Sequence, residues 1–289
     1  MCGIAGSVNF QLNYPQVNAS MGHRGPDAQN GYRSENIDLY HLRLSIVDIA
    51  GGQQPMHLND RYTIIFNGEI YNHLSLRKQF QLQTTTASDT ETLLLLYQIF
   101  GIDFLQYVDG MFVFALYDKH EKKIVIARDR AGKKPLYYFN DGKKFVFASE
   151  LNALNALLPL EIDTSHFHQY LRLGAFYRQS TPYKNVLELG SGSYLTVDTQ
   201  TLKVETKEWW NIHPFYQQQN SDSFETSKEK VDQMLHEGIR RRVESSDLEV
   251  GSFLSGGIDS GLVTAIASQY NKNLKTFTVS FEGEYDEAP

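Results

Sequence analysis

The opening stretch Met1-Cys2-Gly3-Ile4-Ala5-Gly6 contains the only cysteine among the 289 residues of the chain. Removal of Met1 would leave on Cys2 an α-amine whose ordinary pKa, about 7.7–8.0, lies near neutral pH. The amine and the thiol would then belong to one residue, and the amine could act as general base for the thiol, as in enzymes with an N-terminal threonine. Gly3 has no side chain and is expected to let the first strand approach a substrate closely. This stretch therefore predicts a nucleophile at Cys2.

Composition limits the classes of protein to which the chain can belong. Hydrophobic residues make up 41% and charged residues 21% of the chain, a balance typical of globular proteins. The formal net charge of −7 argues against a nucleic-acid binder, and the local basic cluster Arg240–Arg242 is interpreted as a solvated helix face. One cysteine excludes an intrachain disulfide, and neither a signal peptide nor a membrane-spanning run is found. We expect a cytoplasmic protein without a membrane partner.

Strand signals dominate the first two-thirds of the chain. Residues 62–66 are β-branched and aromatic, and the Asn67-Gly68 pair that follows is a turn signal. Two pairs of apolar runs are separated by polar turns and predict hairpins, namely 111–117 with 123–128 and 135–139 with 144–148. Strand pairs with interspersed helices predict sheets that pack together and are covered by helices.

One helix is predicted in this region with clear start and stop signals. Ser88 and Glu91 have the spacing of a capping box, the apolar run 93–100 follows, and Gly101 supplies a stop. This pattern predicts a buried helix.

The character of the chain changes after residue 209. Residues 217–223 are polar and aperiodic, which predicts a linker. Thr226 and Glu229 then have capping-box spacing, and apolar residues recur at helical spacing in the order Val231, Met234, Leu235, Ile239 and Val243. A strand ending at Phe253-Leu254, a glycine turn, a helix over 262–267 and a strand over 276–281 form an order typical of an open parallel sheet. Such a sheet needs more strands, so we expect a second domain that is cut short at Pro289.

Four motifs follow Cys2 in a fixed order, and together with the opening stretch they resemble a known family. They are His23-Arg24-Gly25-Pro26-Asp27, Arg43-Leu44-Ser45-Ile46, Asn67-Gly68-Glu69-Ile70-Tyr71-Asn72 and Ser88-Asp89-Thr90-Glu91. The set resembles the class II glutamine amidotransferases, which are N-terminal-nucleophile hydrolases. The runs 128–138 and 147–150 resemble the asparagine synthetase branch. The resemblance implies an α+β fold, a four-layer αββα sandwich.

The resemblance also implies a role for three residues at the reacting centre. Cys2 would attack the side-chain amide of glutamine and form a thioester. Asn67 and the backbone N–H of Gly68 would form the oxyanion hole, where loss of one donor typically costs about 10²–10³ in rate. By itself, Asn67-Gly68 could be only a turn.

Three further residues would hold the two charged ends of glutamine. The resemblance implies that Arg43 binds the α-carboxylate and that Glu69 and Asp89 face the α-ammonium. Taken singly, Arg43 could be a surface arginine, and Asp89 could serve only the helix dipole. Arg24 and Asp27 are expected to brace a loop through an ion pair rather than to touch substrate.

A glycine-rich loop, Ser255-Gly256-Gly257-Ile258-Asp259-Ser260, joins a predicted strand to a helix. Glycines let backbone N–H groups turn toward an anion, and the helix N-terminus adds partial positive charge. The Walker ending is missing, and an ordinary turn is the alternative. The loop resembles the pyrophosphate loop of ATP pyrophosphatases, which implies ATP and Mg²⁺ as cofactors. Asp259 would act through the metal, and Phe253 and Val279 would flank the adenine.

The resemblance divides the chain into three segments: a class II glutamine amidotransferase domain at 1–210, a linker at 211–225, and a truncated α/β parallel-sheet ATP-pyrophosphatase domain at 226–289. It implies an enzyme that adenylates aspartate with MgATP and amidates it with ammonia from glutamine, giving asparagine, AMP and pyrophosphate. For these 289 residues we expect glutaminase activity at most. The expected partners are the small molecules glutamine, aspartate and ATP, and a homodimer is left open.

Several alternatives share parts of this pattern. β-Lactam synthetases share the architecture but usually lack the cysteine, and related synthetases with another carboxylate acceptor remain open. Amidophosphoribosyl and sugar-phosphate amidotransferases share the first domain but would not continue with the glycine-rich loop. A non-catalytic homologue that retains Met1 would have no free amine beside the thiol.

Overall fold

The chain forms two compact units, one over Met1–Ile212 and one that begins at His213. The structure is a computed structural model that describes residues 1–280. Each unit is described below by itself.

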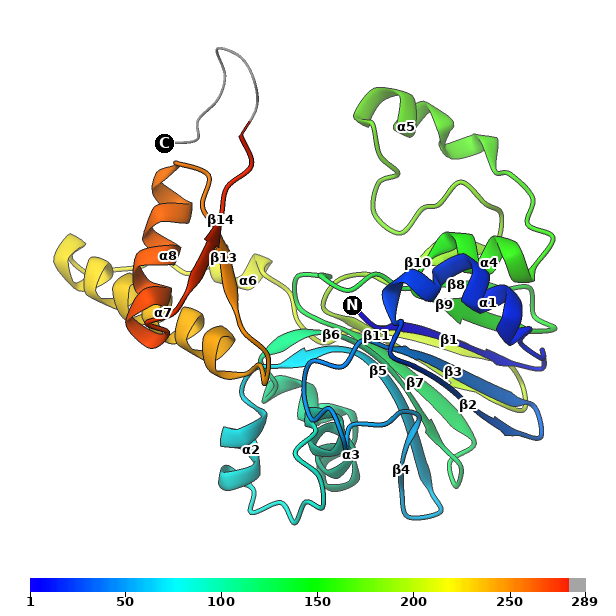
Figure 1. Ribbon diagram of the computed structural model, residues 1–289. Coiled ribbons are helices and arrows are strands. Elements are labelled where there is room, and N and C mark those ends of the chain that lie inside the picture. Colours follow the sequence, from blue (N-terminus) through cyan, green and yellow to red (C-terminus); the bar gives the residue numbers. More distant parts are fainter. Residues whose placement is uncertain (281–289) are drawn as a thin grey trace. The chain divides into compact units, whose positions relative to one another are not determined.

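Two six-stranded sheets build the first unit (Figure 1). Across the first sheet the strands are β10 (Val186–Glu188), β8 (Tyr137–Asn140), β9 (Phe145–Ala148), β1 (Gly3–Val8), β3 (Ile37–Arg43) and β2 (Ala28–Ser34). Across the second they are β12 (Val204–Glu208), β11 (Ser193–Asp198), β7 (Lys123–Arg128), β6 (Gly110–Asp118), β5 (Tyr62–Ile70) and β4 (Met56–Leu58). Neighbouring strands are antiparallel, and β1 pairs with both β3 and β9. Cys2 therefore lies at the start of an internal strand.

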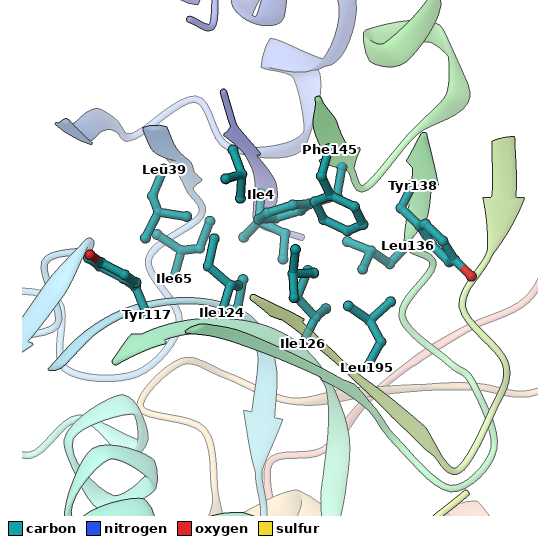
Figure 2. Packing of buried hydrophobic residues seen from close by; sticks show 14 of the residues in the cluster. Ile4, Leu39, Ile65, Tyr117, Ile124, Ile126, Leu136, Tyr138, Phe145 and Leu195 are labelled. Atoms are coloured by element: carbon teal, nitrogen blue, oxygen red, sulfur yellow. The ribbon is translucent and has the colours of Figure 1, made fainter. Parts of the chain in front are cut away.

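The main core fills the space between the two sheets (Figure 2). Ile4 and Leu39 from the first sheet and Ile65, Ile126 and Leu195 from the second are fully buried there. Burial of one such side chain contributes about 1.5–3 kcal/mol. This packing fixes β1, and with it the residue that precedes the strand.

Helices cover the outer faces of both sheets. α1 (Tyr14–Met21) and α4 (Leu151–Leu157) pack on the first sheet, and α2 (His73–Gln79) and α3 (Asp89–Phe100) pack on the second. The predicted four-layer αββα sandwich of the α+β class is confirmed. The other helices of this unit are η1 (Gly22–Arg24), η2 (Gly101–Gln106), η3 (Thr164–His166) and α5 (Phe167–Leu173).

The two predicted hairpins are confirmed as β6–β7 and β8–β9, but the predicted turn at Asn67-Gly68 is wrong. β5 continues through both residues, and Gly68 lies opposite Phe112 of β6. A Cβ at Gly68 would lie 2.2 Å from the carbonyl oxygen of Met111. Glycine is required here because a neighbouring strand approaches closely, and not because the chain turns.

The predicted helix α3 is confirmed, although its capping box is incomplete. Ser88 Oγ accepts a hydrogen bond from the Thr90 N–H at 3.3 Å, and Gly101 ends the helix with a φ of +58°. The Glu91 carboxylate does not return to Ser88. It accepts hydrogen bonds of 2.7–2.9 Å from the backbone and hydroxyl groups of Thr85 and Thr86. The cap therefore fixes the start of α3, and Glu91 fixes the loop before it.

The second unit contains a short parallel sheet, as the sequence predicts. β13 (Gly251–Phe253) pairs in parallel with β14 (Lys275–Phe277), and its helices are α6 (His213–Gln217), α7 (Phe224–Glu244) and α8 (Ile258–Tyr270). Ser223, and not Thr226, caps α7, because Ser223 Oγ accepts from the Thr226 N–H at 3.2 Å. The predicted strand over 276–281 is shorter than expected, and residue 281 lies outside the described residues. α6 falls within the predicted linker.

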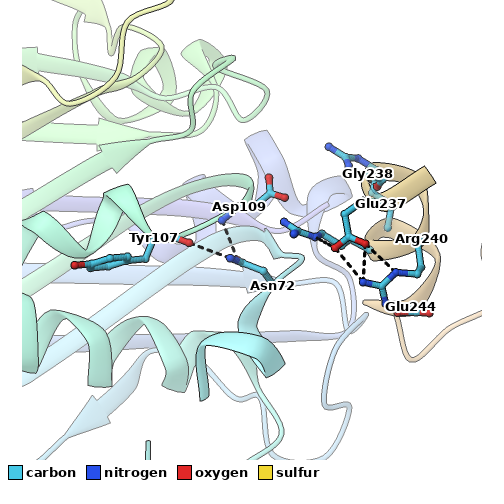
Figure 3. Close-up of polar contacts among 9 residues, drawn as sticks. Asn72, Tyr107, Asp109, Glu237, Gly238, Arg240 and Glu244 are labelled. Carbon is cyan, nitrogen blue, oxygen red and sulfur yellow. Dashed lines mark hydrogen bonds and ion pairs between the residues drawn. The ribbon is translucent and has the colours of Figure 1, made fainter. Parts of the chain in front are cut away.

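The basic cluster on α7 is paired within the helix (Figure 3). Arg240 forms ion pairs with Glu237 and Glu244 at 2.8 and 2.6 Å, and Arg241 with Glu237 at 2.6 Å. These i,i+3 and i,i+4 pairs agree with a solvated helix face. Over residues 1–280, every helix is too short or too polar to traverse a bilayer.

Candidate active site

A small pocket of the first unit brings together all six residues predicted for the amidase half. Its volume is about 60 Å³, and its walls come from the start of β1, the ends of β3 and β5, and the start of α3. The predicted residues that line it are Cys2, Arg43, Asn67, Gly68, Glu69 and Asp89. Met1 lines it as well. The nearness of these residues results from the strand order, since they are scattered over the first 89 positions.

The Cys2 thiol lies against the backbone of Leu44. The Leu44 N–H donates to Sγ at 3.3 Å, and the thiol lies 3.5 Å from the Leu44 carbonyl oxygen. Burial raises the pKa of this thiol above its usual value, although the Leu44 N–H opposes the shift. The thiol is therefore protonated at neutral pH and needs a base before it can act as a nucleophile.

The chain terminus supplies a candidate base. Burial lowers the pKa of the terminal amine, here on Met1, and the positive charges of Arg24 and Lys134 lower it further, while the charges of Cys2 and Asp27 oppose this. An amine with a lowered pKa is more often neutral near pH 7 and can accept a proton.

Arg24 braces the nucleophile through the backbone, and its predicted ion pair with Asp27 is wrong. Arg24 Nε donates to the Cys2 carbonyl at 3.0 Å, and Nη1 pairs with Glu150 at 2.9 Å. Asp27 instead accepts from the Ser45 N–H at 2.7 Å. A Cβ on Gly3 would lie 3.2 Å from a Leu42 methyl and 3.5 Å from the Arg24 side chain. Glycine at position 3 therefore leaves room for these side chains, and the close approach of this strand to substrate stays a prediction.

Asn67 presents an unpaired donor to the pocket. The residue is 1% exposed, and its Nδ2 has no hydrogen-bond partner among residues 1–280. The strand that carries it is fixed on both sides of Phe66: the Phe66 N–H donates to Gln54 at 2.6 Å, and His41 Nε2 donates to the Phe66 carbonyl at 3.0 Å. Burial lowers the pKa of His41 to about 4, so this histidine is neutral. A buried donor without a partner costs about 1–3 kcal/mol, which an acceptor in the pocket would recover.

Arg43 is buried, so the alternative of a surface arginine is wrong. Its guanidinium donates to the carbonyl oxygens of Ile49 at 3.0 Å and Asp48 at 2.6 Å. A Cβ on Gly52 would lie 2.7 Å from Nη2. Arg43 therefore holds a loop of the pocket wall in place while it adds positive charge to the pocket.

Asp89 places a carboxyl group in a fully buried position. Its Oδ2 accepts from the Ile70 N–H at 3.0 Å. Burial raises the pKa of Asp89 to about 7, and the negative charge of Glu69 acts in the same direction. A cation bound in the pocket would favour the ionised form. The pair of carboxyl groups thus suits a positively charged ligand group.

Several pocket residues were missed by the sequence analysis. Gln54, Ser88, Thr90, Met111 and Lys134 also line the pocket. Gln54 Nε2 donates to Thr90 Oγ1 at 3.3 Å, and because its Oε1 accepts from the Phe66 N–H the side chain links β5 to α3. No local signal marks Gln54, whereas Lys134 belongs to the run 128–138 that carries the resemblance.

Asn72, the last residue of the third motif, lies outside the pocket wall and orders the strands behind it (Figure 3). Its Nδ2 donates to the Tyr107 carbonyl at 2.9 Å, and its Oδ1 accepts from the Asp109 N–H at 2.9 Å. The side chain therefore links the end of β5 to the start of β6.

The glycine-rich loop lies between β13 and α8 in the second unit. Ser260 Oγ accepts from the Ser255 N–H at 3.2 Å and donates to the Gly257 carbonyl at 3.0 Å. Gly256 has a φ of +81°, and Asp259 lies in the first turn of α8. Phe253 and Val279 have exposed side chains. Residues 1–280 contain no group of three or more His, Cys, Asp or Glu arranged to hold a metal.

An αββα sandwich with a cysteine before its internal strand β1 defines the N-terminal-nucleophile hydrolase class of fold. The chain belongs to the glutamine amidotransferase domain family, which matches residues 1–210, and residues 230–289 match the asparagine synthase family.

Curated relatives carry the name asparagine synthetase. The chain is 34% identical to a putative glutamine-hydrolyzing asparagine synthetase 2 of Methanocaldococcus jannaschii, over 100% of this chain and 61% of that protein. It is 33% identical to glutamine-hydrolyzing asparagine synthetase 3 of Bacillus subtilis, over 98% and 48%, and 33% identical to asparagine synthetase B of Escherichia coli, over 93% and 45%. The chain thus spans about half the length of these relatives.

A solved structure supports the fold. Glutamine phosphoribosylpyrophosphate amidotransferase from B. subtilis is similar over 98% of this chain and 67% of its own, with a TM-score of 0.52 and 16% identity.

Proposed function

We propose that the chain hydrolyses the side-chain amide of glutamine to glutamate and ammonia, with Cys2 as nucleophile. The observation that carries this proposal is the unpaired, buried Nδ2 of Asn67 in the same pocket as the thiol. Such a donor is arranged for an oxygen that develops negative charge. Arg43 on one wall suits an α-carboxylate, and Asp89 with Glu69 suits an α-ammonium. A pocket with these groups fits a small amino acid held by both charged ends.

The proposed reaction begins when Met1 has been removed. The α-amine of Cys2 takes the thiol proton, and the thiolate attacks the amide carbon of glutamine and forms a C–S bond. The oxygen of the tetrahedral intermediate accepts hydrogen bonds from Asn67 Nδ2 and the Gly68 N–H. The C–N bond breaks, the proton held on the amine passes to the leaving nitrogen, and ammonia departs. Water then attacks the thioester, with the amine again as base, and glutamate is released.

For the full-length protein we propose a glutamine-dependent asparagine synthetase. The match of residues 230–289 and the names of the relatives support aspartate over another carboxylate acceptor. MgATP would convert the carboxylate to an acyl-adenylate, and ammonia would displace AMP to give asparagine. This proposal includes a cytoplasmic location and a division of the chain into the segments 1–210, 211–225 and 226–289. It leaves a homodimer open.

The glycine-rich loop fits the phosphates of ATP by its donor set. The positive φ of Gly256 and the hydroxyls of Ser255 and Ser260 give the loop the curvature and the donors that an anion needs. Gly257 stands at the start of α8, where backbone N–H groups are unpaired. Asp259 would reach the phosphates through Mg²⁺. Phe253 and Val279 would lie beside the adenine.

Replacement of Asn67 by alanine is expected to lower kcat for glutamine hydrolysis by about 10²–10³-fold with little change in KM, because the lost donor acts on the intermediate and not on bound glutamine. The measurement is the release of glutamate and ammonia at saturating and limiting glutamine. Asn30→Ala, at an exposed position of β2, is the matched control and should keep full activity. An unchanged kcat in Asn67→Ala would remove this residue from the oxyanion hole.

These 289 residues are expected to form no asparagine from aspartate, ATP and ammonium, since they span only 61% of the M. jannaschii relative. The measurement is amino-acid analysis after incubation with MgATP, with glutaminase activity in the same preparation as the control for folding. ATP-dependent asparagine formation would contradict this expectation.

A further inference from the structure

Lys134 is a buried cation in the pocket that the proposed reaction does not use. The residue is 3% exposed, and its ammonium donates to the Met1 sulfur, which lies 2.8 Å from Nζ. Thioether sulfur is a weak acceptor. Among residues 1–280, Lys134 has no carboxylate within ion-pair distance. A buried ammonium in such surroundings is costly and is usually found where its charge has a use.

A rigid turn determines where Lys134 lies. The Asp129 carboxylate accepts hydrogen bonds of 3.0–3.2 Å from the backbone N–H groups of Ala131, Lys133 and Lys134, and one of 3.1 Å from Phe112 of β6. Phe112 lies opposite Gly68 in the sheet. The turn is thereby fixed to the strands that form the pocket wall, and the lysine enters the pocket from a position that cannot shift easily.

The contact with Met1 places the ammonium near the future chain terminus. One methionine residue spans at most about 6.5 Å from its sulfur to the nitrogen of the next residue. Nζ, 2.8 Å from that sulfur, therefore lies within about 9 Å of the Cys2 nitrogen. When Met1 is removed, Nζ loses this contact at the same moment as Cys2 gains a free amine.

We propose that Lys134 keeps the α-amine of Cys2 unprotonated near neutral pH and so enables it to act as the base of the glutaminase reaction. The inference rests on the proposed glutaminase function. A fixed positive charge disfavours a second one nearby, so the lysine lowers the pKa of the amine. Lys134 does not touch the reacting atoms and is a positioning residue that acts through the amine.

Arg24 also lowers the pKa of the terminal amine, but unlike Lys134 it is paired with a carboxylate. The charge of Arg24 is shared with Glu150 at 2.9 Å, and the Asp129 carboxylate is engaged by four backbone N–H groups. The terminal amine of the chain already has a lowered pKa, first through burial and then through Arg24 and Lys134, against the thiol and Asp27. Burial lowers the pKa of Lys134 itself, and the charge of Arg24 lowers it further, while the charges of Asp129, Cys2 and Glu69 oppose this.

The test is the pH dependence of kcat/KM for glutamine hydrolysis in Lys134→Met, a substitution that removes the charge and keeps the length. A unit charge about 9 Å away at an effective dielectric constant of about 20 shifts a pKa by about 1.4 units, and salt screening reduces this to roughly one unit. Loss of the charge raises the pKa of the amine, so the acid limb should move up by about one pH unit. At pH values below the amine pKa of both proteins, the activity of Lys134→Met should be about tenfold lower than that of the wild type. At high pH the two activities should be equal.

Two variants separate charge from structure. Lys134→Arg keeps the charge and should keep the acid limb of the wild type. Lys133→Met removes an exposed neighbour from the same turn and should also leave the limb unmoved. Because the chain has one cysteine, incorporation of carbon-13-labelled cysteine gives a single Cα signal, and its titration reports the amine pKa without any turnover. That pKa should rise by about one unit in Lys134→Met alone.

An acid limb and an amine pKa that stay in place in Lys134→Met, in a protein whose glutaminase activity still requires Cys2, would overturn the role of Lys134 and leave the proposed function intact. Glutaminase activity that survives Cys2→Ala would overturn both. Mass spectrometry of each preparation establishes that Met1 is absent before the titration.

Discussion

Cys2→Ala should reduce glutamate release by at least about 10⁴-fold, because no other group in the pocket can form the thioester. The pocket contacts of this side chain are to the backbone of Leu44, so its loss should leave the fold and the two walls that hold glutamine in place. The measurement is glutamate and ammonia produced per unit time at saturating glutamine.

Binding and labelling provide the controls for this substitution. Glutamine should still bind to Cys2→Ala with an affinity close to that of the wild type, measured by calorimetry. An electrophilic analogue of glutamine should add to the wild-type chain once, at Cys2, and not to the variant. Equal glutamate release from both proteins would remove Cys2 from the mechanism.

A chain that retains Met1 should hydrolyse glutamine about 10²–10⁴-fold more slowly than one that begins at Cys2, because the amine is then displaced from the thiol and the general base is lost. The raised pKa of the thiol makes this loss severe, since the thiol does not ionise readily without help. In the structure, Met1 also occupies part of the pocket wall.

One preparation can supply both forms. A removable N-terminal extension that leaves Cys2 first after cleavage allows activity to be measured before and after, with mass spectrometry of the intact chain to define each form. Cys2→Ala treated in the same way is the control for the cleavage step. Full activity before cleavage would assign the base to another group and would favour a mechanism that does not use the α-amine.

Local patterns in the sequence predicted the elements whose signals are local. The hairpins β6–β7 and β8–β9 and the helix α3 follow from turn residues and apolar runs alone. The turn expected at Asn67-Gly68 was wrong because Gly68 is required by the close approach of β6, a strand more than 40 positions away. Contacts between distant strands leave no local pattern, and the same limit applies to Gln54.

The candidate site was reached through the order of its motifs and not through any single residue. Arg24 and Asp27 were predicted to pair, since they are near in the chain and opposite in charge. In the folded chain Arg24 meets Glu150, which β9 and the start of α4 bring beside β1. Lys134 was not singled out, since a lysine beside another lysine suggests a solvated turn until the burial of one of them is known.

The half-buried, protonated state of the Cys2 sulfur has a consequence for the durability of the protein. Peroxides and disulfides react with thiolates far faster than with thiols, so a cysteine with a raised pKa resists conversion to sulfenic acid or a mixed disulfide in its resting state. Reactivity is then confined to the interval in which the α-amine has taken the proton from the thiol. The same burial that makes a base necessary also protects the sulfur from oxidants between turnovers.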